Sequence, residues 1–166
     1  MHGIDVETTA LTPDEGSLRL VQISDGETAK VYDAFHQNHD TIRRAVEAHD
    51  ELVAHNATFE QMWLRESLGI DRADLDDTMV MSQVVFTGTR AVLNRSFGHS
   101  LQAVLKRELK VEIEKDEQTS DWGAAELTRE QLEYAARDAL RADPRHRDAP
   151  ETEKEQRSWW RRMVRH

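Results

Sequence analysis

The chain has 166 residues, of which 38% are hydrophobic and 33% are charged. This length and composition are typical of one globular domain with a substantial core. The chain contains no cysteine, which excludes disulfides, thiolate metal sites and cysteine nucleophiles. Its formal net charge of −10 argues against a broad surface for binding a nucleic acid duplex.

Residues 2–11 carry two carboxylates one residue apart, within a short apolar run. Side chains alternate between the two faces of a strand, so we expect Asp5 and Glu7 on one face and Ile4 and Val6 on the other. Two carboxylates this close raise each other's pKa unless a cation lies between them. Mg²⁺ and Mn²⁺ prefer oxygen ligands. The pattern alone fits either a metal site or the solvated edge of an acidic protein.

The residues that follow predict that most strands of the sheet precede most of the helices along the chain. A turn containing Pro13 and Gly16 follows the first strand, and an Asp25-Gly26 turn joins the next two strands into an antiparallel meander. The strands expected after the first are residues 18–24, 28–34 and 52–54. This order of strands and helices predicts a mixed sheet flanked by helices.

Polar residues that precede apolar residues at helical spacing predict where the helices begin. The expected caps are Asp40, Asn56, Asp77, Ser100 and Thr128, the last in a capping box with Gln131. We expect the second of these helices to end at Gly69, the third at Phe86 and the last near Ala142. Residues 87–99 are predicted to form a loop, and residues 110–127 an irregular charged segment.

Further carboxylates are placed where they could join the pair on the first strand. Glu60 falls in the first turn of a helix, after the sequence His55-Asn56. Tyr134 and Asp138 are four residues apart and share one face of the last helix, so a phenol lies one turn from a carboxylate.

Taken in chain order, these pieces resemble the three motifs of the DEDDy 3′–5′ exonucleases. The matching residues are Asp5-x-Glu7-Thr8, Asn56-x-x-Phe59-Glu60 and Tyr134-x-x-x-Asp138. That family includes ribonuclease D and the proofreading domains of family A DNA polymerases, many of them from phages. The resemblance covers roughly residues 2–142. It implies the α/β ribonuclease H-like fold, with a five-stranded mixed sheet of an antiparallel meander plus parallel strands, flanked by helices.

The resemblance also implies two divalent metal ions, Mg²⁺ or Mn²⁺. Asp5, Glu7 and Asp138 would bind one ion. Asp5 would share the second ion with Glu60, and Tyr134 would orient the attacking water. The family usually has Asp where this chain has Glu60, and the extra methylene changes the reach of the carboxylate to the second ion.

Three further residues match positions near the substrate in the family. Thr8 and Leu11 match residues that contact the terminal nucleotide, Leu11 as an apolar wedge. Asn56 matches a residue that supports the site, and capping of the following helix is an equally good role for it.

The implied function is release of nucleoside monophosphates from the 3′ end of single-stranded nucleic acid, with DNA favoured over RNA. The alternatives are RNA 3′-end trimming, as in ribonuclease D, and a non-catalytic nucleic-acid-binding module on the same fold. An acidic body is compatible with a site that engages only the end of a strand. A separate DNA polymerase is a candidate partner. We expect a cytoplasmic protein without membrane contact, because the chain has no signal peptide and no apolar run of membrane-spanning length.

The predicted exonuclease domain comprises residues 1–142, and residues 143–166 form a charged linker and a Trp/Arg-rich tail. This last segment holds seven Lys or Arg and five Asp or Glu, together with Trp159 and Trp160. The tail is interpreted either as a short helix that docks on the body or as a nucleic acid contact that uses stacking and charge.

Overall fold

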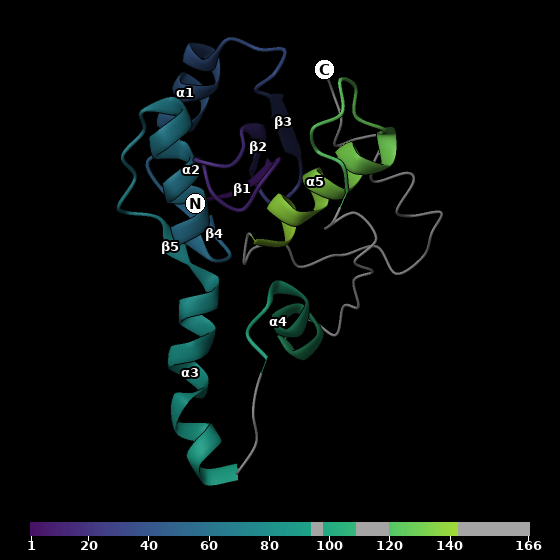
Figure 1. Ribbon diagram of the computed structural model, residues 1–166. Helices are drawn as coiled ribbons and strands as arrows, with labels where there is room; N and C mark the ends of the chain where they lie inside the picture. The colour runs from purple at the N-terminus through teal and green to yellow at the C-terminus, as the bar shows by residue number, and fades with distance from the viewer. Residues whose placement is uncertain (94–97, 109–119, 143–166) are drawn as a thin grey trace.

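A five-stranded mixed sheet organises the computed structural model, which describes residues 1–93, 98–108 and 120–142 (Figure 1). The strands lie in the order β3-β2-β1-β4-β5. Strand β2 pairs antiparallel with β1 and β3, whereas β4 runs parallel to β1 and to β5. The bounds are β1 His2–Thr8, β2 Leu18–Ser24, β3 Ala29–Asp33, β4 Leu52–Ala54 and β5 Asp76–Asp77. The predicted meander plus parallel strands is confirmed, and the two-residue β5 is too short to be located by periodicity.

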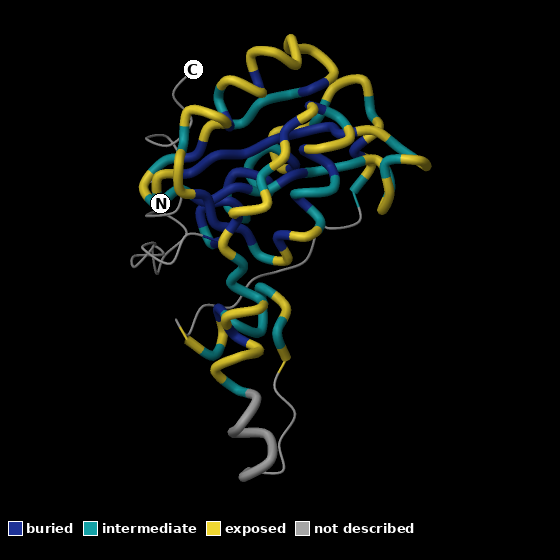
Figure 2. The backbone as a smooth tube through the Cα atoms, turned by 90° about the vertical axis from the view of Figure 1, so that its left-hand side faces the viewer, coloured by how far each residue is buried: buried dark blue, intermediate teal, exposed yellow. Residues whose placement is uncertain are grey.

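Five helices are present in the described residues, and three of them cover the sheet. Their bounds are α1 His39–Glu47, α2 Ala57–Leu68, α3 Thr78–Leu93, α4 Leu101–Glu108 and α5 Arg129–Ala142. Helices α1 and α2 pack on one face, and α5 packs on β1, β2 and β3 on the other. Helix α3 extends away from the sheet with α4 beside it (Figures 1 and 2).

Alternation along β1 and β2 separates the two faces of the sheet. Ile4 is fully buried and Val6 is 5% exposed, and both pack in the core that contains Ile42 of α1 and Trp63 of α2. Leu20 of β2 points the other way and belongs to the cluster beneath α5. The face opposite Ile4 and Val6 is therefore the one that α5 covers.

Capping side chains determine where three of the helices begin. The predicted capping box of α5 is confirmed, because the Thr128 N–H donates to Gln131 Oε1 at 2.8 Å and the Gln131 N–H donates to Thr128 Oγ1 at 3.2 Å. Ser100 also caps α4 as predicted. Helix α1 is capped by Asn38, whose side chain accepts from the Asp40 N–H at 2.7 Å. The prediction of Asp40 as this cap is wrong, because Asp40 already lies in the first turn.

Asp77 caps two helices at once. Its Oδ1 accepts from the N–H groups of Met79 at 2.8 Å and Asn56 at 3.1 Å, and its Oδ2 accepts from the Ala57 N–H at 3.0 Å. Asn56 occupies the N-cap position of α2 with a left-handed φ of 79°, but its side chain makes no capping hydrogen bond. The predicted cap of α3 is confirmed, whereas capping of α2 by the Asn56 side chain is wrong.

Helix α2 ends at Gly69 as predicted, with a left-handed φ of 66°. Helix α3, in contrast, continues to Leu93, so the prediction of a loop from residue 87 is wrong for residues 87–93. A single Gly within a helix costs only about 1 kcal/mol relative to Ala, so Gly88 does not end α3. The rest of that predicted loop includes residues 94–97, which lie outside the described residues.

Hydrogen bonds connect α3 and α4 to the end of the sheet. His55 follows β4, with its Nδ1 2.9 Å from Thr78 Oγ1 and its Nε2 2.9 Å from the His99 carbonyl oxygen. The ring of His99 contacts Ser82 Oγ on α3 at 2.9 Å, and Arg107 on α4 donates to the same hydroxyl at 2.7 Å. His55, the residue before Asn56, is thus connected to α3 through Thr78 and to the start of α4 through His99.

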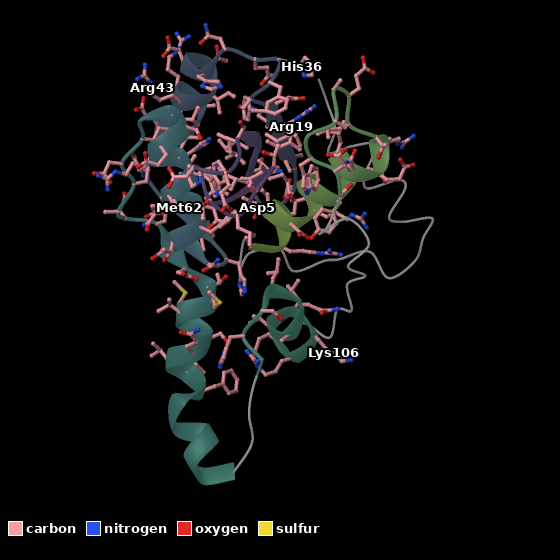
Figure 3. The ribbon with its side chains drawn as sticks, viewed as in Figure 1. Asp5, Arg19, His36, Arg43, Met62 and Lys106 are labelled. Carbon is pink, nitrogen blue, oxygen red and sulfur yellow. The ribbon has the colours of Figure 1, made fainter. Side chains whose placement is uncertain are left out.

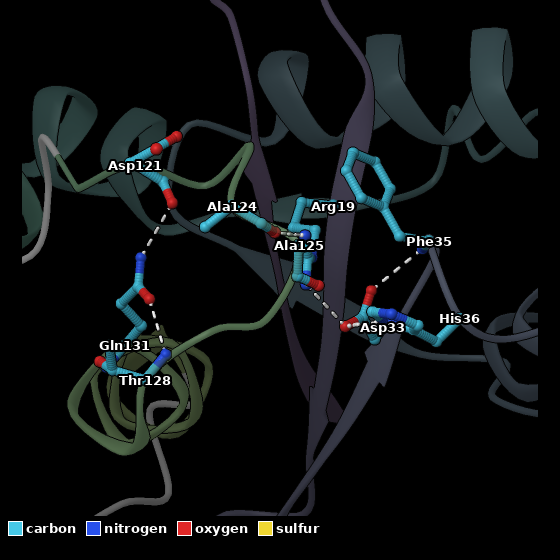
Figure 4. A network of polar contacts seen from close by, with 9 residues as sticks. All are labelled: Arg19, Asp33, Phe35, His36, Asp121, Ala124, Ala125, Thr128 and Gln131. Atoms are coloured by element: carbon cyan, nitrogen blue, oxygen red, sulfur yellow. Dashed lines mark hydrogen bonds and ion pairs between the residues drawn. The ribbon is translucent and has the colours of Figure 1, made fainter.

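The segment that leads into α5 is fastened to the sheet by Arg19 (Figure 4). This side chain is fully buried and donates to the carbonyl oxygens of Ala124 and Ala125. It also pairs with Asp33 Oδ2 at 3.0 Å. The side-chain amide of Gln131 holds the same segment from the α5 side. These bonds fix where α5 begins on the sheet.

Residues 120–127 contain no helix or strand, in agreement with the irregular segment predicted there. The remainder of that segment within residues 109–119, and the predicted linker and tail at residues 143–166, lie outside the described residues. Within the described ranges, no helix has the length and apolar character needed to cross a membrane.

Replacing Asp77 by Ala should lower the free energy of unfolding by about 2–4 kcal/mol, because the N-termini of two helices lose their acceptor. Asp76 is an exposed neighbour and provides the control, since Asp76→Ala should change stability by less than about 0.5 kcal/mol. Urea unfolding of both variants checks this. Equal stability of the two variants would contradict the double cap.

Candidate active site

The two carboxylates of β1 lie under the edge of α5. Asp5 and Glu7 are partly buried and project from the face opposite Ile4 and Val6, as the alternation predicts. Figure 3 shows Asp5 on the sheet between α2 and α5. Burial raises the pKa of Asp5 well above its usual range, and the Asp138 carboxylate raises it further.

Glu7 links the β1 carboxylates to those on the helices. Burial raises its pKa, and the charges of Asp5, Asp138 and Glu60 add to the effect. Side chains from β1, α2 and α5 therefore lie within one another's electric field. The structure brings together all four carboxylates that the sequence motifs identified.

Glu60 reaches this group from the first turn of α2. It shares a helix face with Trp63 and Leu64, three and four residues further on, and both of these are fully buried. The same packing carries Glu60 inward, where it is 3% exposed and its Oε2 has no hydrogen-bond partner. Burial and the Asp5 charge raise the pKa of Glu60 well above its usual range.

Tyr134 and Asp138 enter from α5, one turn apart on the same face. Burial raises the pKa of Asp138, although the Tyr134 hydroxyl and the nearby Arg141 and Arg137 oppose the increase. Burial and the Asp138 charge raise the pKa of Tyr134, so its hydroxyl remains protonated at neutral pH. Tyr134 is thus available as a hydrogen-bonding group beside the carboxylates, not as a base.

Arg141 is a site residue that the sequence motifs do not identify. Its Nη1 lies 3.6 Å from Asp138 Oδ1, an atom that has no hydrogen-bond partner. The i,i+3 spacing of the two residues on a predicted helix was the available signal. Arg137, beside Asp138 on the same helix, donates from Nε to the Glu133 carbonyl oxygen at 3.1 Å.

Thr8 is the last residue of β1, and Leu11 and Asn56 lie in the segments that follow β1 and β4. Because these strands are parallel, both segments leave the sheet in the same direction. Thr8 Oγ1 donates to the Ala10 carbonyl oxygen at 2.6 Å. Leu11 is 79% exposed, and Asn56 is also exposed. Leu11 and Asn56 are therefore accessible to a ligand at this edge of the sheet.

Comparison with solved structures finds the same architecture in nucleases. NrnC of Brucella melitensis bound to pGG is 26% identical and has a TM-score of 0.71, and the match covers 98% of this chain and 72% of that one. NrnC with bound Mg²⁺ is also 26% identical with a TM-score of 0.71, over 97% of this chain and 73% of that one. Escherichia coli RNase D, an exoribonuclease involved in structured RNA processing, is 22% identical with a TM-score of 0.66, over 84% of this chain and 36% of that one. At that identity RNase D shows the fold alone.

Sequence comparison identifies the family. DNA polymerase I of Aquifex aeolicus (strain VF5) is 33% identical over 138 residues, which are 82% of this chain and 21% of the polymerase. The chain therefore spans about one fifth of the length of this relative. A family model described as a 3′–5′ exonuclease matches residues 2–141, so the chain belongs to the 3′–5′ exonuclease family, in its DEDD type.

Proposed function

We propose that the chain is a metal-dependent exonuclease that hydrolyses the terminal phosphodiester of a single-stranded 3′ end and releases nucleoside monophosphates. The observation that carries this proposal is the convergence of Asp5, Glu7, Glu60 and Asp138 where β1 meets α2 and α5. Burial raises the pKa of all four, and neighbouring carboxylates raise the pKa of Asp5, Glu7 and Glu60 further. Retention of all four carboxylates and of Tyr134 argues against a module that only binds nucleic acid.

The chemistry of these side chains fits divalent metal ions. In the part of the chain that the structure describes, no three His, Asp or Glu side chains are already arranged to hold a metal ion. Two oxygens nevertheless lack any hydrogen-bond partner, Glu60 Oε2 and Asp138 Oδ1. Clustered carboxylates with raised pKa values are stabilised by a cation, and Mg²⁺ and Mn²⁺ select oxygen ligands.

We assign Asp5, Glu7 and Asp138 to one ion, and Asp5 and Glu60 to a second. When bound, such ions generate hydroxide from water and stabilise the leaving oxygen. Tyr134, protonated at neutral pH, orients the attacking water through its hydroxyl.

Substrate contacts are assigned to residues at the open edge of the site. Exposed Leu11 packs against the terminal base, and Thr8 contacts the terminal nucleotide beside it. Asn56, whose side chain does not cap α2, is free to support the bound strand from the other side. Engagement of only a strand end suits a chain with a net charge of −10.

We propose single-stranded DNA as the preferred substrate, with a separate DNA polymerase as a candidate partner. The 33% identity to a DNA polymerase I supports both points. RNA is the second candidate, because the NrnC structures include one with pGG bound and match almost all of this chain.

End-labelled DNA and RNA strands of the same sequence decide between these substrates. With Mg²⁺ or Mn²⁺ we expect stepwise shortening from the 3′ end, faster on DNA than on RNA. Asp138→Asn should reduce the rate by about 10²-fold or more, because it removes a ligand oxygen charge. Activity of Asp138→Asn above a few per cent of the parent would contradict the metal assignment.

The stability of the protein in a chelator should fall as the pH rises from 5 to 7. The four carboxylates have pKa values raised by folding, so the folded chain binds protons more tightly than the unfolded chain and loses stability as they ionise. Asp5→Asn should raise the free energy of unfolding at pH 7 by roughly 1–2 kcal/mol and reduce this pH dependence. Thermal unfolding with and without Mg²⁺ measures both effects.

The control for this stability measurement is Asp14→Asn, at an exposed position in the turn after β1, which should change neither quantity. An unchanged pH dependence in Asp5→Asn would show that Asp5 does not interact with the other carboxylates.

Glu60→Gln should raise the Mg²⁺ concentration needed for activity, because it selectively weakens binding of the second ion. Glu60→Asp keeps the charge and should stay within about tenfold of the parent rate. Mn²⁺ should reduce the difference in rate between Glu60→Asp and the parent, since Mg²⁺ demands more nearly ideal octahedral geometry. Rates measured against metal concentration test this. If Glu60→Gln matches the parent at every Mg²⁺ concentration, Glu60 is not a ligand.

A further inference from the structure

Gln22 of β2 is a fully buried amide, and neither of its polar atoms has a hydrogen-bond partner among the residues that the structure describes. Both Oε1 and Nε2 are inaccessible to solvent and unpaired. Leaving a buried amide unsatisfied destabilises a protein by about 1–3 kcal/mol for each polar group. The buried amide of Gln131 differs, because it bonds to Thr128, Ser120 and Asp121. The unpaired state of Gln22 therefore requires an explanation that the fold does not supply.

The register of the sheet places this amide directly beside the proposed metal site. Gln22 is the antiparallel partner of Asp5, and opposite residues of such a pair project from the same face with Cβ atoms about 5 Å apart. Leu20, two residues earlier on β2, packs beneath α5, so Gln22 also faces α5.

Burial excludes direct contact between Gln22 and a substrate. Asp5 is partly exposed, whereas its neighbour Gln22 is fully buried, so the amide lies on the protein side of Asp5. The other neighbour of Gln22 in the sheet is Val31, which has no polar side chain. Of the two residues directly opposite Gln22 in the flanking strands, Asp5 is thus the polar one, and Glu7 is the diagonal neighbour on the same face of β1.

We propose that Gln22 is a positioning residue for Asp5: its amide N–H donates to the Asp5 carboxylate and holds that carboxylate in the orientation that binds the metal ion. This inference rests on the metal site of the proposed function. No hydrogen bond joins the two side chains in the structure, so the contact forms by a rotamer change or through one bridging water. Removing a group that hydrogen-bonds to a metal ligand and orients it typically lowers metal affinity by 10- to 100-fold.

Gln22→Met removes the amide and keeps a similar volume. In calorimetry, its affinity for Mn²⁺ should fall by about 10- to 100-fold. In a chelator, its midpoint of thermal unfolding should stay equal or rise by about 2–4 °C, because an unsatisfied buried amide has been removed. A purely structural residue would show the opposite, with lower stability and unchanged metal affinity.

Gln131→Met is the matched control, since it makes the same change at a buried amide whose partners are all present. It should lower the midpoint of unfolding by several degrees, about 2–8 °C, and leave Mn²⁺ affinity within about twofold of the parent. The role of Gln22 is overturned if Gln22→Met binds Mn²⁺ as the parent does, or if it unfolds as readily as Gln131→Met or fails to fold.

The two proposals fail in different ways. If the parent neither binds Mn²⁺ nor shortens a strand, the proposed function is wrong and the role of Gln22 falls with it. If the parent does both and Gln22→Met binds Mn²⁺ equally well, only the role of Gln22 is wrong.

Discussion

Repulsion between carboxylates that are partly removed from water is the constraint on which the rest of this structure depends. Burial raises the pKa of Asp5, Glu7 and Glu60. The Asp138 charge raises the pKa of Asp5 further, and the Asp5 charge raises the pKa of Glu7 and Glu60 further. The packing on the opposite face of the same strand must offset this unfavourable term. Ile4 and Val6 alternate with the carboxylates along β1 and bury apolar surface against α1 and α2. One short strand thus joins a strongly stabilising core to a destabilising polar site.

The two helices that complete the site are held by polar anchors outside it. Ala135, Ala136 and Ala139 are almost fully buried, and their small side chains allow α5 to lie close to the sheet. The buried side chain of Arg19 fastens the segment that precedes α5, and Asp77 fixes the first turn of α2 through its backbone N–H groups. Among the described residues, neither Arg19 nor Asp77 forms a hydrogen bond with the carboxylates of β1. Their effect is to leave α2 and α5 little freedom to move apart under the repulsion.

Features that depend on sequence neighbours were predictable from residue spacing, whereas the strand register and the distant contacts of the supporting residues were not. Alternation in β1 and the capping box of α5 use spacings of two and three residues, so the sequence displays them directly. The bond from Asp77 to the Asn56 N–H spans 21 residues, and no local pattern reveals it. The pairing of Gln22 with Asp5 requires the register of the hairpin, which the sequence does not specify. The order of the motifs along the chain was sufficient to identify the family. The positions of Asp77 at the start of α2 and of Gln22 beside Asp5 could be identified only from the structure.

The contacts of Asp77 with the start of α2 offer a physical explanation for a Glu at position 60. Asp77 binds the backbone at the start of α2 and, although it is a smaller influence than burial or Asp5, its charge raises the pKa of Glu60. Both carboxylates therefore occupy the N-terminal end of one helix, where the helix dipole favours negative charge but the two charges repel each other. Relative to an Asp, the longer side chain extends its carboxylate by one methylene from the helix backbone that Asp77 caps. The additional reach allows one helix terminus to carry both its cap and a carboxylate directed at Asp5.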